Sequence, residues 1–219
     1  MTGSDMGVFF RSRRYCIAAL LLGAVLGLSH AQTTAQRTVL VLGDSLSAEY
    51  GLARGTGWVT LLEQRLAKEK PGTRVVNASI SGETTFGGRS RLAALLAQHK
   101  PTHVILELGG NDALRGLSLD ATRAILEWMT QQSKKAGARV LLLGMQMPPN
   151  YGADYAKRFE GLYAQVARAE KVGLVPFFLK GVADGADPTR LFQPDRIHPT
   201  TEAQPLMLDN VWPELKKIL

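Results

Sequence analysis

The stretch TVLVLGDSLSAEYGL, residues 38–52, leads from an apolar run of strand length, 38–42, directly into a glycine, an aspartate and a serine. A continuous apolar run that ends at a turn signal is typical of a strand buried on both faces of a sheet. Ser45 therefore stands just beyond the carboxyl end of the predicted strand. A serine in that position is a turn residue, a helix cap or a nucleophile.

Four more apolar runs follow, at residues 74–78, 103–108, 139–144 and 173–178, and we expect all five runs to be buried strands. Between the runs, apolar residues recur at helical spacing, and the tryptophans at 58, 128 and 212 are expected in the cores of these helices. Parallel neighbours need crossover connections, so alternating strands and helices indicate a mostly parallel sheet. The sequence thus predicts one α/β domain over 38–219, a three-layer α/β/α sandwich around a five-stranded sheet.

The N-terminal segment has the pattern of an export signal. Three arginines precede a small and apolar run over 16–28, which ends at Ser-His-Ala, residues 29–31. The run is too short to span a bilayer comfortably. We expect a signal peptide over 1–31 that is cleaved after Ala31, a flexible leader over 32–37, and an exported protein, periplasmic or secreted. An uncleaved N-terminal anchor is the alternative.

Composition limits the classes of partner. The chain carries a net charge of +7, and removing residues 1–31, with three arginines and one aspartate, lowers the charge to +5. The basic residues are spread along the chain without interleaved aromatic residues, which argues against a nucleic-acid partner. Cys16, the single cysteine, leaves with the signal peptide. We expect a monomer with no disulfide and no stable membrane anchor after cleavage.

A serine hydroxyl needs a base within hydrogen-bond reach, and the base needs an acceptor that fixes its tautomer. His198 in QPDRIHPTTEAQ, residues 193–204, has Asp195 three positions earlier, and Pro199 is expected to start a helix behind it. The pattern predicts a Ser45–His198–Asp195 site, although in isolation Asp195 and His198 fit a chance turn pair. His99 and His103 are four residues apart, but Pro101 forbids a helix between them, so no metal site is predicted.

Acyl transfer builds negative charge on a carbonyl oxygen, which requires hydrogen-bond donors aimed at that point. We predict three donors: the backbone N–H of Ser45, the backbone N–H of Gly82, and the side-chain amide of Asn111. All three follow predicted strands, and in open α/β sheets the carboxyl ends of the strands form the ligand-binding edge. The alternative for GGND, residues 109–112, is a glycine-rich turn. Asp44 and Asp112 are expected to brace loops.

These segments, GDSLS, NASISGET, GGND and DRIHP, resemble the four blocks of the SGNH-hydrolase, or GDSL lipase/esterase, family. The likeness extends over 38–217 and is greatest to the exported thioesterase, arylesterase and lysophospholipase branch. It implies a flavodoxin-like fold, Ser45 as nucleophile, His198 as general base and then acid, and Asp195 as its orienter, with no cofactor. Glu49 and Glu83 depart from the glycine and aspartate that are common at those two positions.

The resemblance implies a serine hydrolase that cleaves carboxylic esters and thioesters of acyl chains, including lysophospholipids. Apolar residues in the same loops are candidates for the acyl pocket; they are Leu46, Phe86, Leu114, Met147, Pro148, Tyr151 and Ile197. Two alternatives stay open. One is a deacetylase-type esterase acting on acetylated carbohydrate, and the other is a non-catalytic ligand-binding protein on the same fold.

Overall fold

The computed structural model describes residues 37–219, so the predicted signal peptide and the leader up to residue 36 lie outside the described residues. Five parallel strands form one sheet in the order β2-β1-β3-β4-β5. Their bounds are β1 Arg37–Gly43, β2 Thr73–Asn77, β3 His103–Glu107, β4 Arg139–Leu143 and β5 Gly173–Val175. This strand order is the flavodoxin-like one.

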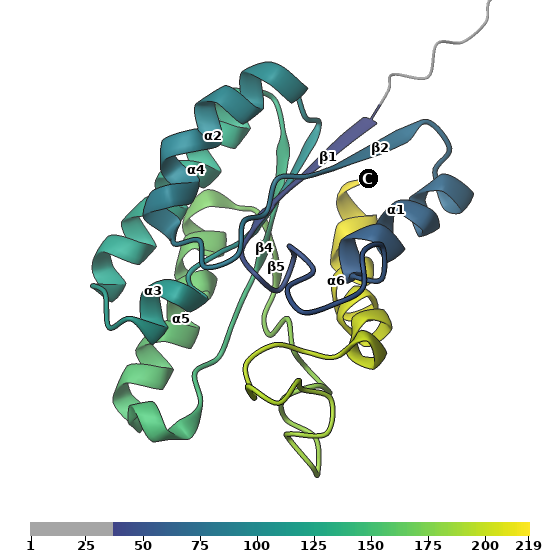
Figure 1. Ribbon diagram of the computed structural model, residues 1–219. Coiled ribbons are helices and arrows are strands. Elements are labelled where there is room, and N and C mark those ends of the chain that lie inside the picture. The colour runs from purple at the N-terminus through teal and green to yellow at the C-terminus, as the bar shows by residue number, and fades with distance from the viewer. Residues whose placement is uncertain (1–36) are drawn as a thin grey trace, which may run out of the picture. The chain divides into compact units, whose positions relative to one another are not determined.

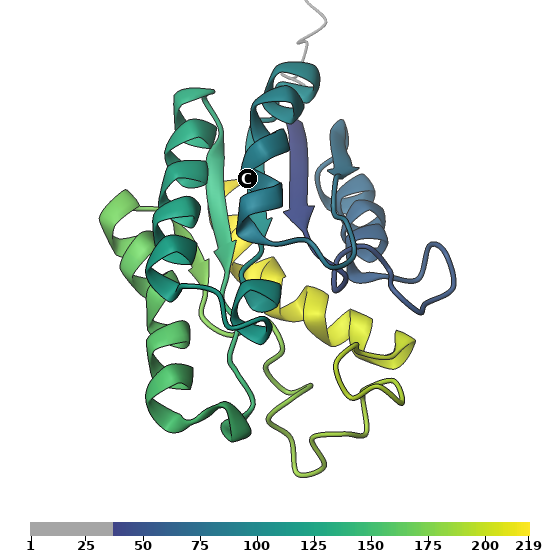
Figure 2. The ribbon, with the colours of Figure 1, turned by 60° about the vertical axis from the view of Figure 1, so that its left-hand side comes forward.

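Helices connect the strands and cover both faces of the sheet. They are α1 Trp58–Glu69, α2 Thr85–His99, α3 Gly110–Leu114, α4 Leu119–Lys135, α5 Ala153–Glu170 and α6 Gln204–Ile218, with short 3₁₀ turns η1 Pro149–Tyr151 and η2 Thr201–Ala203. Figures 1 and 2 show α1 and α6 on one side of the sheet and α2, α4 and α5 on the other. The predicted three-layer α/β/α sandwich is confirmed. In residues 37–219 we find no helix with the length and apolar character of a membrane span.

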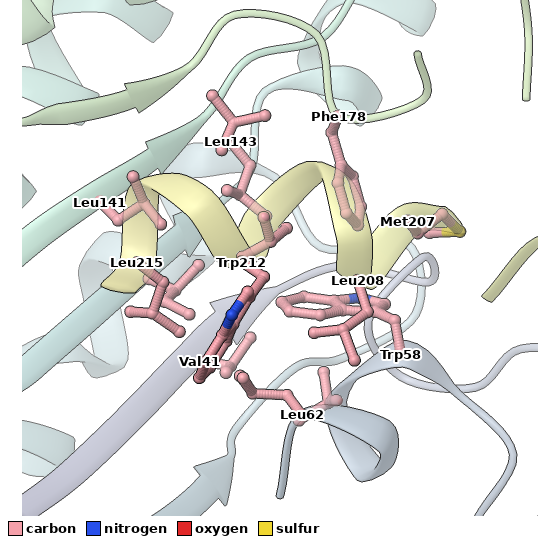
Figure 3. Close-up of a cluster of buried hydrophobic side chains, with 14 of the residues drawn as sticks. Val41, Trp58, Leu62, Leu141, Leu143, Phe178, Met207, Leu208, Trp212 and Leu215 are labelled. Carbon is pink, nitrogen blue, oxygen red and sulfur yellow. The ribbon is translucent and has the colours of Figure 1, made fainter. Parts of the chain in front are cut away.

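Alternate residues of the strands feed two separate cores, because successive side chains point to opposite faces of a sheet. Val39 and Val41 of β1 pack with α1 and α6, and Leu40 and Leu42 pack with α2, α4 and α5. Figure 3 shows the first of these cores, in which Trp58 of α1 and Trp212 of α6 lie near Val41. Burial on both faces explains why the central strands are continuous apolar runs.

Local signals set the bounds of the helices. Thr84 caps α2 by accepting a hydrogen bond from the N–H of Gly87, and Ser118 caps α4 by accepting from the N–H of Ala121. Such side-chain caps satisfy backbone donors that the first turn of a helix leaves free. Lys134 and Lys135 in the last turn of α4 complement the negative end of the helix dipole.

The edges of the sheet differ from the predictions. β2 is an edge strand with half-exposed or exposed residues, not a buried strand, because only β1 pairs with it. β5 ends at Val175 instead of residue 178, since Pro176 has no N–H to continue a ladder. β1 starts at Arg37, which pairs with Thr73 and therefore belongs to the sheet instead of the leader. Trp128, expected in a helix core, is only half-buried and lies under the guanidinium of Arg89.

His103 is a buried residue at the opposite end of the sheet from Ser45. Its Nε2 lies 2.7 Å from the carbonyl oxygen of Ile218, and its Nδ1 lies 2.8 Å from the hydroxyl of Thr102. Burial lowers the pKa of His103, and the nearby charges of Arg139 and Arg37 lower it further, while the hydrogen bond to Ile218 acts in the opposite direction. The folded protein therefore holds His103 neutral.

Acid is expected to destabilise the fold through His103. The unfolded chain takes up a proton near pH 6.5, the usual histidine pKa, and the folded chain takes it up only at lower pH. The free energy of unfolding should fall as the pH drops below about 6.5, by about 1.4 kcal/mol for each pH unit between the two pKa values. Urea unfolding of His103→Gln between pH 7.5 and 5 should show a smaller fall than wild type, with His99→Gln as the control. An equal fall in His103→Gln would contradict this assignment.

Candidate active site

Ser45, His198 and Asp195 meet at the carboxyl edge of the sheet. Ser45 lies in the turn directly after β1, and its Oγ is 2.9 Å from Nε2 of His198. The other ring nitrogen of His198, Nδ1, is 2.6 Å from Oδ2 of Asp195. The imidazole thus bridges the hydroxyl and the carboxylate, which is the arrangement by which a serine is activated for attack on a carbonyl.

The loop between β5 and α6 fixes Asp195 in place. Its Oδ1 accepts hydrogen bonds from the backbone N–H groups of Ile197 and His198, each at 3.0 Å. Burial by itself would raise the pKa of Asp195, but these bonds and the His198 ring lower it to about 2. Asp195 is therefore a carboxylate at any pH where the imidazole is neutral, and it accepts from Nδ1–H.

The prediction for Pro199 is wrong, because Pro199 does not start a helix. It pairs with Phe192 in an isolated antiparallel bridge, and the helical turns begin later, at Thr201. The backbone N–H of Gln193 also donates to the carbonyl of His198 at 2.8 Å. The loop that carries His198 is thus closed on itself like a short hairpin, which holds the imidazole in position.

A second loop, residues 44–57 between β1 and α1, packs against the His198 loop. The rings of Tyr50 and His198 are 4.3 Å apart, and Nε2 of Gln193 donates to the carbonyl of Tyr50 at 2.9 Å. Glu49 braces this loop, since its carboxylate accepts from the N–H groups of Gly55 and Gly57. Glu49 itself has a φ of 59°, a left-handed conformation that favours glycine, so its departure from the family pattern is compensated by the bonds of its side chain.

The three predicted oxyanion donors lie on the connections that follow β1, β2 and β3. Within residues 37–219, the backbone N–H groups of Ser45 and Gly82 have no hydrogen-bond acceptor. Asn111 is the second residue of α3, and its side-chain amide donates to Oδ2 of Asp44 at 3.0 Å. One N–H of that amide is used in this way, and the other is left for a ligand.

Two carboxylates brace these loops, as predicted. Asp44 accepts from the N–H of Leu46 through Oδ1, at 3.0 Å. Asp112 joins two helices, because its Oδ2 accepts from the N–H of Thr85 at 2.8 Å and its Oδ1 accepts from the hydroxyl of Thr85. Glu83, the second departure from the family pattern, lies in the loop after β2 and pairs with Arg91 of α2 at 2.8 Å.

Large exposed apolar side chains gather at the same edge. In residues 37–219 there are seven, and every one lies on a connection after the carboxyl end of a strand or in the first turn of a helix there. They are Tyr50, Ile80, Phe86, Leu114, Leu117, Tyr151 and Ile197, which we call the apolar rim. Four of the seven predicted acyl-pocket residues belong to it. Of the others, Met147 is buried in the core, Leu46 is half-buried against the core, and Pro148 is exposed.

A cavity of about 890 Å³ lies along α5 and at the end of β5. Its lining includes Lys157, Arg158, Gly161 and Leu174 but none of the residues that meet at the sheet edge. The residues that meet at the sheet edge therefore do not line this cavity.

Sequence reasoning missed a buried polar network under the site. Glu107, the last residue of β3, is fully buried, and its Oε2 accepts from the hydroxyl of Ser47 at 2.7 Å and from the N–H of Asp44 at 3.2 Å. The indole of Trp58 donates to Ser47 Oγ at 3.2 Å. The sequence did contain a signal for this network. Glu107 stands near the end of a buried apolar run, and a buried carboxyl group needs hydrogen-bond partners.

Comparison with known proteins identifies the family of this chain. Residues 41–205 match the GDSL-like Lipase/Acylhydrolase family. The chain is 50% identical to Esterase TesA of Pseudomonas aeruginosa over 202 residues, covering 92% of this chain and 99% of the relative. It is 40% identical to Thioesterase 1/protease 1/lysophospholipase L1 of Escherichia coli over 188 residues, covering 86% of this chain and 88% of the relative.

Solved structures give the same result. The crystal structure of TesA superposes with a TM-score of 0.80 at 52% identity, covering 84% of this chain and 100% of that one. The psychrotrophic esterase EstA from Pseudoalteromonas sp., in a structure inhibited by monoethylphosphonate, superposes with a TM-score of 0.76 at 41% identity, covering 83% and 97%. This chain therefore belongs to the GDSL-like lipase/acylhydrolase family and is an ester hydrolase.

Proposed function

We propose that the protein hydrolyses carboxylic esters and thioesters of acyl chains, lysophospholipids among them, through a Ser45–His198–Asp195 triad and without a cofactor. The observation that carries this proposal is the contact of 2.9 Å between Ser45 Oγ and His198 Nε2, which joins residues 153 positions apart in the chain. The printed names of the relatives, esterase, thioesterase, lysophospholipase and arylesterase, support the same substrate classes.

In the first half of the reaction, Nε2 of His198 takes the proton of Ser45 as Oγ attacks the carbonyl carbon. The oxygen that becomes negative accepts hydrogen bonds from the N–H groups of Ser45 and Gly82 and from the Asn111 amide. The tetrahedral intermediate collapses, the bond to the leaving oxygen or sulfur breaks, and His198 gives its proton to the leaving group. The acyl group then sits on Ser45.

In the second half, water replaces the departed alcohol or thiol. His198 takes a proton from water as the water oxygen attacks the acyl-enzyme carbonyl, and the second intermediate collapses to the free acid. Ser45 regains the proton from His198, so the enzyme returns to its starting state. Asp195 stabilises the imidazolium formed in each half without taking a proton, because its pKa lies far below that of an imidazolium.

Asn111→Ala should lower kcat by about 10²–10³-fold, which is the usual cost of losing one oxyanion donor. KM should change little, because the donor acts mainly on the charge that develops in the transition state. Steady-state kinetics on a nitrophenyl ester measure both constants, with Asn150→Ala, an exposed asparagine after β4, as the matched control. A wild-type kcat in Asn111→Ala would remove Asn111 from the oxyanion hole.

The apolar rim supports an acyl-chain substrate, because exposed apolar side chains grouped on one face of a protein mark a binding surface. Phe86 is 69% exposed and Ile197 is 50% exposed, and a bound acyl chain would cover them. The double variant Phe86→Ser with Ile197→Ser should lower kcat/KM for a long-chain ester by about 10–100-fold, the value of one or two lost side-chain contacts. Turnover of an acetyl ester is the internal control, and an equal loss on both esters would contradict a role in chain binding.

The decisive experiment for the substrate class is a chain-length series of nitrophenyl esters and of acyl thioesters with the purified protein. We expect turnover of both, rising with chain length, and an initial burst of released nitrophenol as the acyl-enzyme forms. Preference for acetyl groups alone would favour the deacetylase alternative. No turnover of any member would leave only the ligand-binding alternative.

The same proposal includes an exported monomer with a small-molecule substrate. The arginines and the apolar run before Ala31 support export with cleavage after that residue. The N-terminal sequence and the solution mass of the protein recovered from its native compartment test both points. A chain that starts at Gln32 and sediments as one copy is expected, and an intact N-terminus or a dimer would contradict them.

A further inference from the structure

Two buried acidic residues, Glu107 and Asp44, lie next to Ser45 and have no role in the proposed reaction steps. Glu107 and Asp44 are 1% and 3% exposed, and the backbone N–H of Asp44 donates to Oε2 of Glu107 at 3.2 Å, which places the two carboxyl groups close enough to be hydrogen-bond partners. Two carboxyl groups can share a hydrogen bond only when one of them carries a proton. A pair of buried charges so close together would also be very costly.

The contacts assign the proton to one member of the pair. Asp44 accepts through both of its oxygens, from the N–H of Leu46 at 3.0 Å and from the Asn111 amide at 3.0 Å, as a carboxylate does. In the described residues Glu107 accepts only through Oε2, which leaves Oε1 to carry a proton. Burial raises the pKa of Glu107 well above its usual value, and the charge of Asp44 raises it further. Burial also raises the pKa of Asp44, but its hydrogen bonds and the charge of His198 limit it to about 6. At neutral pH Glu107 is the acid, and Asp44 carries the charge.

The surrounding fold holds Glu107 in place. Ser47 Oγ donates to Glu107 at 2.7 Å and accepts from the indole N–H of Trp58 at 3.2 Å. Gly43 makes room for the pair, since a Cβ there would lie 2.6 Å from Oε2 of Glu107. A line of hydrogen bonds thus runs from the core at Trp58 through Ser47, Glu107 and Asp44 to the Asn111 amide.

We propose that Glu107 is a positioning residue that, as a neutral acid, donates a hydrogen bond to Asp44. It thereby holds the carboxylate that aims the Asn111 amide into the oxyanion hole. The inference rests on the proposed function, because it concerns the same site. Glu107 touches no substrate atom and acts only through Asp44 and Asn111. Its second effect is to fix the first turn of the Ser45 loop, because it also accepts from the N–H of Asp44 at 3.2 Å.

Two substitutions at one position separate this role from simple packing. Glu107→Gln keeps both functions of the acid, because its amide N–H₂ can donate to Asp44 while its carbonyl accepts from Ser47. Glu107→Met has a similar length, but it cannot donate to Asp44 and has no oxygen to accept from Ser47. We expect Glu107→Gln to keep kcat within about 3-fold of wild type, and Glu107→Met to lower kcat by about 10–100-fold with KM nearly unchanged, less than the loss of a whole oxyanion donor.

A double-mutant cycle tests whether Glu107 acts through Asn111. In an Asn111→Ala background the amide is absent, so Glu107→Met should lower kcat by less than about 3-fold, since coupled residues are not additive. Should Glu107→Met fail to fold, Asp44→Asn takes its place in the same cycle, because it removes one acceptor from either Leu46 or Asn111. Circular dichroism melts report folding in every variant.

The outcomes are distinct. Equal losses of kcat in Glu107→Gln and Glu107→Met would overturn the inference, and so would a full loss from Glu107→Met in the Asn111→Ala background. In both cases the proposed function still stands as long as the wild type hydrolyses esters. An inactive wild type would instead end the proposed function itself. Recovery of kcat in Glu107→Gln, together with non-additivity, is the result we expect.

Discussion

Ser45→Ala is expected to lower kcat for a nitrophenyl ester by about 10⁴–10⁶-fold, the cost seen when a triad serine is removed. The physical reason is that no other hydroxyl of the described residues hydrogen bonds to the His198 ring, so nothing replaces the nucleophile that the imidazole activates. The remaining groups still bind substrate and stabilise the oxyanion, so a small activity above that of water should persist.

The control for Ser45→Ala is Ser90→Ala, an exposed serine of α2 that lies outside the site. Equal melting temperatures for the two variants would show that the loss is chemical. If Ser45→Ala kept wild-type turnover, the reaction would not pass through an acyl-serine, and the mechanism would be wrong.

His198→Ala is expected to have a comparable effect, about 10⁴–10⁶-fold on kcat, because triad members act as a unit. The imidazole is the only ring within hydrogen-bond distance of Ser45 Oγ among the described residues, and it must both take and return the proton. The double variant Ser45→Ala with His198→Ala should be no slower than either single variant. His99→Ala, at the end of α2, is the control.

Two results would contradict this role for His198. One is a double variant whose loss is the product of the two single losses, which would mean that serine and histidine act independently. The other is an equal loss in His99→Ala, which would point to a general effect on folding.

The sheet was predictable because burial on both faces leaves a strong signal in the sequence. Val39, Leu40, Val41 and Leu42 are all fully buried, so β1 is a continuous apolar run. Edge strands lack that signal, and the predictions failed there: β2 is half-exposed, and β5 ends at Val175, before Pro176. A short apolar run does not show whether its strand lies at the edge of the sheet, paired on one side only, or in the buried centre.

The residues of the site were predictable where chemistry restricts the choice. A serine, a histidine and a carboxylate at loop positions of the same sheet edge have few other joint explanations, and the structure brings Ser45, His198 and Asp195 within hydrogen-bond distance. The supporting network was not predictable. Glu107 and Ser47 show their function only through contacts that join β3 to the loop after β1, 60 positions apart.

Met147 is a predicted acyl-pocket residue whose side chain the structure buries. Its position in an apolar loop after β4 suggested an acyl pocket, yet the side chain is 9% exposed and belongs to the core beside α5. Loop composition alone does not tell which apolar side chains turn inward. Only the structure distinguishes Met147 from the apolar loop residues that stay exposed, such as Phe86 and Ile197.

The central claim is that Ser45 forms the covalent bond to the acyl group, and an alkyl fluorophosphonate tests this most directly. A relative has a structure inhibited by monoethylphosphonate. Peptide mass spectrometry of the labelled protein should place one phosphonate adduct on the peptide that contains Ser45, and Ser45→Ala should carry none. An adduct on any other residue, or equal labelling of Ser45→Ala, would contradict the account.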